Sequence, residues 1–345
     1  MRFTNLSFLG ILAAGIMAIT GPVSSFEIES ITNYPVDQPE QQLRIISTAD
    51  TELFAPLVLA FQQNNPNVAI EYTTVSSAQL MQAISIEGVA FDVAISSAMD
   101  LQTKLANDGY TLQHRSDAVD LLPDWGRWRY NVFAFTQEPA SIVISPEAFE
   151  GLPVPRTRQD LISILRDNPD RFAGRVGTYD VRSSGLGYLF ATQDARTSDT
   201  FWRLTEVMGS LGTQLYCCSN DMIEDVASGK IAVAYNVLGS YAAARDDLSQ
   251  DIRIIAPADF TTLMLRSAVI PVNAQNPELA GKFIDHLILS AWTGAGASYY
   301  PFPELTNDTG ATALRPIRLG PGLLVFLDGL KRQRFLREWE AAVLR

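Results

Sequence analysis

One short stretch of the chain consists mostly of hydrogen-bond donors: Arg182, Ser183, Ser184 and Gly185. It lies between a strand-like run at residues 176–179 and an apolar stretch with helical spacing. A guanidinium offers a planar fork of donors, hydroxyls add more, and glycine lets the backbone approach a ligand closely. Such a set selects a ligand rich in acceptors, a carboxylate or a phosphate. The stretch therefore predicts an anion site, although Arg182 is equally consistent with a solvated surface charge.

Three other turns have the same position between a predicted strand and a predicted helix: residues 47–51, 96–98 and 219–220. Free N–H groups at a helix N-terminus suit an anion or a polar ligand. Ligands of open α/β sheets bind beyond the carboxyl ends of the strands. Helix capping explains the same serines and threonines equally well. The candidate ligand residues in these turns are Ser47, Thr48, Asp50, Thr51, Ser96, Ser97, Ser219 and Asn220.

Five further residues complete the candidate site. Tyr179, Tyr235 and Asn236 stand at the ends of predicted strands, Tyr241 begins a predicted helix, and Arg266 belongs to a predicted strand. The tyrosines are also consistent with core packing. Arg266 lies on a predicted strand, where it either reaches the site or pairs with an acid. We favour Arg182 as the anion ligand, because it is the one full cation within the four turns.

Catalysis is a weaker interpretation of the same residues. A hydrolase needs a base beside its Ser or Cys nucleophile, and the sequence has two histidines, His114 and His286, in unremarkable contexts. Neither a G-x-S-x-G elbow nor an H-E-x-x-H motif occurs. We therefore predict a binding protein rather than an enzyme, with no cofactor and no metal ligand.

Composition and charge restrict the partners. The 345 residues include 47% hydrophobic and 19% charged residues, which is typical of a packed globular protein. The net charge of −12 argues against nucleic acid or an anionic membrane surface as a partner. The two cysteines, Cys217 and Cys218, are adjacent, so in an oxidising compartment they form either a vicinal disulfide or two buried thiols.

The N-terminus has the pattern of an export signal. Arg2 precedes an apolar run at residues 8–19 that is too short to span a bilayer, and small residues follow it. We predict a cleaved signal peptide over residues 1–25, with an uncleaved anchor as the alternative. An irregular leader is expected over residues 26–42, because this stretch is polar and contains two prolines.

The remaining chain alternates strand and helix patterns in two blocks. Three strand–helix units are expected within residues 43–109, and another α/β run begins near residue 175. A strand over residues 263–272 leads back to the first block, and an amphipathic helix over 323–344 closes the chain. We assign residues 43–138 and 268–345 to lobe 1 and residues 139–267 to lobe 2. Two crossings, near 136–141 and 266–273, predict a hinge and an interlobe cleft.

These segments, in this order, resemble the solute-binding proteins of ABC importers, in particular the type II group of ferric-iron-binding proteins and their organic-anion relatives. The resemblance lies in the export signal, FDVAISS, GRVGTYDVRSSGLGYLFATQ, VASGKIAVAYNVLGSY and VIPVNAQNPELAGKFIDHLI, together with the stretch from Leu43 to Tyr72. It implies a two-lobed type II periplasmic binding protein fold of the α/β class. It also implies closure of the lobes on the ligand and delivery to a membrane permease. We expect an exported, soluble periplasmic protein that is a monomer.

One departure from this family bears on the ligand. Iron-binding members carry two adjacent tyrosines where this sequence has Ser240-Tyr241, so one phenolate ligand is missing. Ferric iron requires several hard oxygen ligands. We therefore expect a small organic anion, a carboxylate or a phosphorylated metabolite. The alternatives are a ferric-iron importer component and a sensory binding protein that reports to a membrane receptor or kinase.

Overall fold

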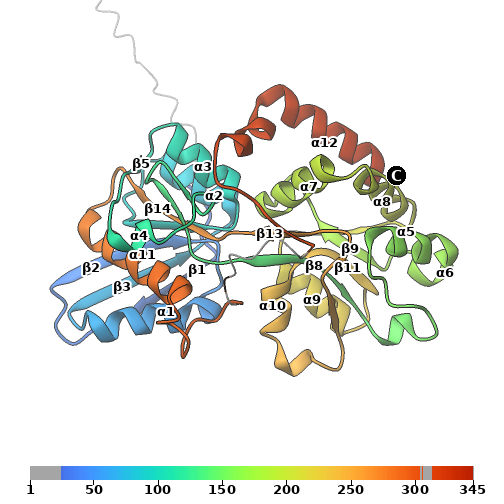
Figure 1. The fold of residues 1–345 in the computed structure, drawn as a ribbon, viewed down its shortest axis with the longest axis horizontal. Helices are drawn as coiled ribbons and strands as arrows, with labels where there is room; N and C mark the ends of the chain where they lie inside the picture. Colours follow the sequence, from blue (N-terminus) through green and yellow to red (C-terminus); the bar gives the residue numbers. More distant parts are fainter. Residues whose placement is uncertain (1–24, 304, 306–312, 345) are drawn as a thin grey trace, which may run out of the picture.

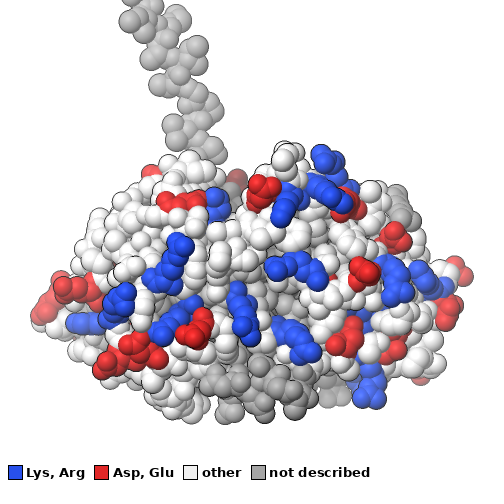
Figure 2. All heavy atoms as spheres, turned by 45° about the horizontal axis from the view of Figure 1, so that its top comes forward, with Lys and Arg blue, Asp and Glu red and all other residues white. Residues whose placement is uncertain are grey.

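The computed structural model describes residues 25–303, 305 and 313–344, and its ribbon consists of two α/β lobes joined by extended segments (Figure 1). The predicted signal peptide, apart from Ser25, lies outside the described residues. Within the described part of the chain, no helix is long and apolar enough to cross a membrane. On the face drawn in Figure 2, basic and acidic side chains are interspersed.

The first lobe is built on an eight-stranded sheet with the order β1-β3-β2-β4-β14-β7-β6, in which β5 pairs with β14. β2 pairs in parallel with both β3 and β4, as successive strand–helix units require. The strands are β1 (Ser30–Tyr34), β2 (Gln41–Ser47), β3 (Val68–Thr74), β4 (Val93–Ser96), β5 (Thr111–Leu112), β6 (Arg127–Trp128), β7 (Val132–Ala134) and β14 (Ser267–Pro271).

The helices of the first lobe cover this sheet with apolar side chains at helical spacing. Phe54, Leu57 and Phe61 of the first helix are buried in one core with strand residues Leu43 and Ile70. Burying each such side chain contributes about 1.5–3 kcal/mol. The helices are α1 (Thr51–Asn64), α2 (Ser77–Met81), which continues into the π-helical segment η1 (Gln82–Ile86), α3 (Met99–Asn107), α4 (Asp117–Asp120) and α11 (Pro277–Trp292).

The second lobe contains a seven-stranded sheet with the order β10-β9-β11-β8-β13-β15, in which β12 pairs with β8. β9 pairs in parallel with β10 and β11, whereas β8 is antiparallel to β11 and β13. The strands are β8 (Glu138–Ile144), β9 (Val176–Tyr179), β10 (Gln214–Tyr216), β11 (Val233–Leu238), β12 (Arg253–Ile255), β13 (Thr261–Met264) and β15 (Leu314–Pro316).

Several helices of the second lobe begin at polar turns that satisfy their first N–H groups. Thr157 and Asp160 form a capping box at the start of α5. The helical segments are η2 (Glu147–Phe149), α5 (Arg158–Asp167), α6 (Pro169–Phe172), α7 (Gly185–Thr197), α8 (Thr200–Ser210), α9 (Ser219–Ala227), α10 (Gly239–Ala243), η3 (Asp246–Leu248), η4 (Pro321–Leu327) and α12 (Gly329–Val343).

Two local predictions need correction. The expected irregular leader contains β1, which pairs antiparallel with β3 and extends the first sheet. The single strand expected over residues 263–272 is divided at Leu265 and Arg266 into β13, which belongs to the second sheet, and β14, which belongs to the first. Both strands are buried and mostly apolar, so the sequence pattern gives little sign of this change of sheet.

The C-terminal residues also differ from the predicted assignment to lobe 1. β15 pairs with β13 in the second sheet, and α12 packs on α8 above the second lobe (Figure 1). Phe335 and Trp339 of α12 are buried against Phe201 and Tyr188. Gly209 on α8 has no side chain, so the backbone at Ala342 approaches it closely. Beyond the two predicted crossings, the chain therefore enters the second lobe once more.

Candidate functional site

A cavity of about 420 Å³ lies between the two lobes, and we call it the interlobe cavity. Residues of both lobes line it, and each of the four predicted turns contributes to the wall. The lining residues are Glu29, Thr48, Asp50, Val75, Ser76, Ser77, Ser97, Tyr179, Ser183, Ser184, Gly185, Leu186, Cys217, Cys218, Ser219, Asn220, Asp221, Leu238, Tyr241 and Arg266.

Helix N-termini converge on this cavity. α1, α2, α3, α7 and α9 each begin within or beside the lining residues, following strands whose carboxyl ends face the same space. The first N–H groups of a helix have no partner within the helix, and its N-terminus carries a partial positive charge. Ser76 and Ser184 each cap one such N–H group. The remaining groups favour a negatively charged or acceptor-rich ligand.

Arg266 is the one residue with a full positive charge among those that line the interlobe cavity. Its side chain is fully buried, and its Nε and Nη2 atoms donate to the Glu138 carboxylate at 3.0 and 3.3 Å. Thr136 and Ser240 also donate to this carboxylate. Within the described part of the chain, Nη1 of Arg266 has no hydrogen-bond partner. A buried unpaired donor is costly, so this nitrogen is suited to an acceptor supplied by a ligand.

Burial is the largest cause of the pKa shifts of Asp50 and Tyr241 on the cavity wall. Burial raises the pKa of the Asp50 carboxyl, and this effect exceeds the lowering by Arg266 and by the hydrogen bond from Asn220. Burial also raises the pKa of Tyr241 to about 12, although Arg266 lowers it. The Tyr241 phenol is therefore neutral at physiological pH, and it acts as a hydrogen-bond donor or acceptor.

Contacts across the cavity hold the lobes close together. Asn220 of the second lobe donates to the Asp50 carboxylate at 2.5 Å, and the Asp50 N–H donates to the Tyr241 hydroxyl at 3.4 Å. Beside them, the backbone of Gly185 packs against Ser77 and Ala98 of the first lobe. The structure thus has the lobes in contact around the cavity.

Replacing Gly185 with valine is expected to hinder this closure and to weaken ligand binding. A Cβ atom at Gly185 would lie 2.8 Å from Ser77 Cβ and 3.3 Å from Ala98 Cβ. Overpacking of this kind costs about 1–3 kcal/mol, or roughly a 5- to 150-fold loss of affinity. Calorimetry with the ligand released from the native protein measures this loss, and small-angle scattering measures compaction.

Gly329→Val is the matched control for this prediction. Gly329 is also the first residue of a helix, and a Cβ atom there would meet nothing within 4 Å. The control should bind and compact like the native protein. Native affinity and compaction in Gly185→Val would show that closure does not depend on this contact.

The structure joins Cys217 and Cys218 in a disulfide at the cavity wall, directly before α9. We expect reduction to weaken ligand binding, because the freed turn regains conformational freedom that must be lost again when ligand binds. Calorimetry with and without reductant tests this, and mass analysis verifies the redox state. A Cys217→Ser/Cys218→Ser variant should not respond to reductant. An equal response in that variant would contradict the prediction.

Most predicted site residues lie on the cavity wall, but several do not. Ser47 and Ser96 are buried and hydrogen-bond within their own lobe, and Thr51 contacts Thr74. Tyr235 and Asn236 both donate to the buried Asp194 carboxylate in the second lobe. The predicted residues that line the cavity are Thr48, Asp50, Ser97, Tyr179, Ser183, Ser184, Gly185, Ser219, Asn220, Tyr241 and Arg266.

Arg182, which the sequence favoured, lines a neighbouring cavity of about 330 Å³ instead. Its Nε and Nη2 atoms donate to the Asp180 carboxylate at 2.8 and 2.6 Å. This exposed pair lowers the pKa of Asp180. With its fork directed at a carboxylate two residues away, Arg182 is less suited than Arg266 to hold a ligand in the interlobe cavity.

Sequence reasoning missed several lining residues: Glu29, Val75, Ser76, Ser77, Leu186, Asp221 and Leu238. Ser76 and Ser77 follow β3 and precede α2, so the strand–turn–helix rule could have found them. Glu138, which orients Arg266, gave no local signal, because the two residues are far apart in the chain.

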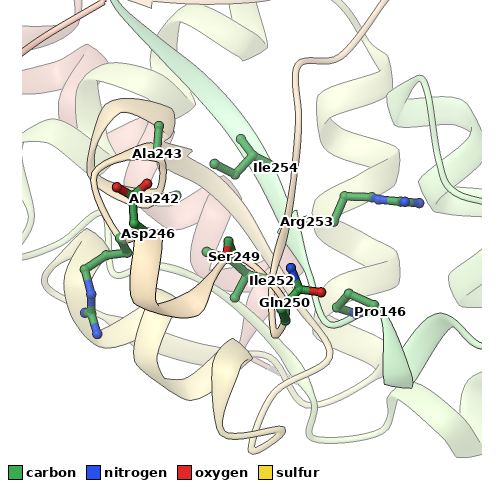
Figure 3. A pocket seen from close by; sticks show the side chains of 10 residues that line it. Pro146, Ala242, Ala243, Asp246, Ser249, Gln250, Ile252, Arg253 and Ile254 are labelled. Carbon is green, nitrogen blue, oxygen red and sulfur yellow. The ribbon is translucent and has the colours of Figure 1, made fainter.

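A larger cavity, of about 500 Å³, lies in the second lobe alone, between α10 and β12 (Figure 3). Arg245 on its wall already binds Glu224 and Asp247. Since the first lobe contributes nothing to it, this cavity cannot couple ligand binding to closure of the lobes. We therefore take the interlobe cavity as the candidate ligand site.

Two lobes with a ligand-sized cavity between them define a two-lobed binding protein. Residues 46–293 match the family model described as bacterial extracellular solute-binding protein, and the chain belongs to this family. It is a solute-binding protein of an ABC transporter and not an enzyme. The predicted family, fold and absence of enzyme activity are thereby confirmed. No curated protein matches the chain.

Solved structures share this fold, and two of them hold different solutes. The substrate-binding protein of an ABC transporter from Agrobacterium tumefaciens is 31% identical, with a TM-score of 0.82 over 92% of this chain and 98% of that chain. The periplasmic binding protein AfuA from Actinobacillus pleuropneumoniae, with fructose-6-phosphate bound, is 17% identical (TM-score 0.70, 88% and 99% covered). Iron-bound HitA from Pseudomonas aeruginosa is 16% identical (TM-score 0.65, 89% and 99% covered).

Proposed function

We propose that this protein captures a small organic anion, a carboxylate or a phosphorylated metabolite, in the interlobe cavity and delivers it to the permease of an ABC importer. The observation that carries the proposal is the buried Nη1 of Arg266, which is without a partner among the described residues, on a wall formed by helix N-termini. A carboxylate or phosphate oxygen would satisfy this nitrogen and the nearby N–H groups together. The protein acts as a periplasmic monomer in this proposal.

The fold is compatible with such a ligand, because AfuA holds fructose-6-phosphate in a similar fold. The cavity volume of about 420 Å³ lies within the usual range for small-molecule sites. Arg266, rather than the sequence-favoured Arg182, is the proposed anchor of the anion.

Ferric iron is the competing ligand, because HitA binds iron and Tyr241 lines the cavity. Among the described residues, the His, Cys, Asp and Glu atoms close enough to share an ion belong to Cys217, Cys218 and Asp221. Two of these residues form the disulfide, so they do not offer the hard oxygen ligands that ferric iron requires. The sequence has one pair of adjacent tyrosines, Tyr299 and Tyr300, and both are engaged elsewhere. The Tyr299 hydroxyl shares a hydrogen bond with Ser290, and the Tyr300 hydroxyl donates to the Phe135 carbonyl.

Native mass spectrometry of gently purified protein, followed by identification of the released ligand, tests the proposal. The expected result is a small molecule with a carboxylate or phosphate group that rebinds in calorimetry. Release of iron or a neutral sugar would overturn it. Pulldown from membranes distinguishes an importer permease from a sensory receptor or kinase as the partner.

A further inference from the structure

The interlobe cavity has an acidic side as well as a donor-rich wall. Glu29, Asp50 and Asp221 all line it, the first two from the first lobe and the third from the second lobe. Arg266 is the one basic residue among the lining residues, and its charge is already balanced by Glu138. A purely anionic ligand would therefore enter a cavity with excess negative charge.

The negative charges of these acidic groups also affect one another's pKa. Burial, and then the neighbouring charge of Asp50, raises the pKa of the Glu29 carboxyl. The pKa of Asp50 is raised by burial and lowered by Arg266 and by the hydrogen bond from Asn220, and after these effects it is raised by repulsion from Glu52 and Asp221. Mutual repulsion between carboxylates is relieved when a cation lies between them.

We propose that the natural ligand is a small zwitterion, which carries an ammonium group beside its carboxylate or phosphate. The proposal rests on the function proposed above, since the anionic group binds Arg266. The ammonium group lies on the acidic side of the cavity and donates to the Asp50 carboxylate, which can only accept when it is charged. Glu29 of the first lobe and Asp221 of the second lobe add negative charge on the same wall.

The acidic residues do not carry this inference by themselves. The independent observation is Nη1 of Arg266, a fully buried nitrogen that has no partner in the described part of the chain and belongs to the same cavity. It requires an acceptor, whereas the carboxylates require a donor with positive charge. One ligand satisfies both only if it carries the two charges on separate groups.

Matched pairs of ligands test the inference. The pairs are 4-aminobutyrate with butyrate and phosphoethanolamine with ethyl phosphate, each measured by thermal shift and calorimetry on the full chain. Within the pair whose anionic group binds, the amine-bearing member is expected to bind at least about tenfold more tightly. Equal or tighter binding of the amine-free member would overturn the zwitterion inference while leaving the anion function intact.

Binding of ferric ion or neutral sugars, with no binding of any member of the two pairs, would instead overturn both the zwitterion and the anion function. These outcomes separate failure of the inference from failure of the proposed function.

Asp50→Asn adds a readout that a structural role would not produce. The amide keeps the shape of the side chain but removes its charge. Affinity for the amine-bearing ligand should fall about tenfold, while affinity for the amine-free anion should stay equal or rise. Asp124→Asn, which changes a fully exposed carboxylate away from the cavity, should alter neither. Equal losses for both ligands in Asp50→Asn would contradict the inference.

Discussion

Replacing Arg266 with lysine is expected to weaken binding of the released ligand by about 10- to 100-fold, which corresponds to roughly 1.5–3 kcal/mol for hydrogen bonds to charged groups. Lysine keeps the positive charge beside Glu138, but it is a point charge without the fork of the guanidinium. The single nitrogen of lysine can pair with the Glu138 carboxylate, but lysine has no further nitrogen in the position of Nη1 on the cavity wall. Calorimetry at constant ionic strength measures the loss.

Arg182→Ala is the control for this experiment. Arg182 lies outside the lining of the interlobe cavity and pairs with Asp180, so its removal should change the affinity by less than about twofold, as is usual for surface ion pairs. A large loss of affinity in Arg182→Ala, together with native affinity in Arg266→Lys, would show that the anion binds at the turn of Arg182, as the sequence predicts. Circular dichroism of both variants verifies that each is folded.

The contrast between these two arginines marks the limit of sequence reasoning at this site. Arg182 stands in a turn before a helix, which is the local context of an anion ligand, but Asp180 is near enough in the chain to occupy it. Arg266 stands in a buried run that reads as plain strand. Its role depends on Glu138, which lies 128 residues away in the chain. Local patterns indicate which turns face a cleft, whereas pairing across the fold decides which charge is free.

More of the fold than of the site could be predicted from the sequence, because strand–turn–helix units depend on local patterns. β9 covers the predicted residues 176–179, and α1 ends at Asn64, two residues before Pro66, which lacks the N–H group that a helix requires. The position of α12 could not be predicted from local patterns in the same way. Its basic face is visible in the sequence, but its packing on α8 depends on long-range contacts of Phe335 and Trp339.

The second large effect concerns stability. Replacing Glu138 with alanine is expected to lower the free energy of unfolding by about 3–5 kcal/mol, because it leaves the fully buried Arg266 guanidinium without its charge partner. The two residues lie on the segments that cross between the sheets: Glu138 begins β8, and Arg266 lies between β13 and β14. Chemical denaturation followed by circular dichroism measures the change.

Glu138→Leu combined with Arg266→Met should regain most of this stability, because removing both charges eliminates the unpaired buried ion. The double variant should nevertheless fail to bind the ligand, since it lacks the nitrogen proposed to hold the anion. Asp120→Ala, which breaks the exposed pair with Arg127, should barely move the unfolding midpoint. A double variant that is stable and still binds with native affinity would show that the buried pair serves the hinge alone, and the anion would then have to bind elsewhere on the cavity wall.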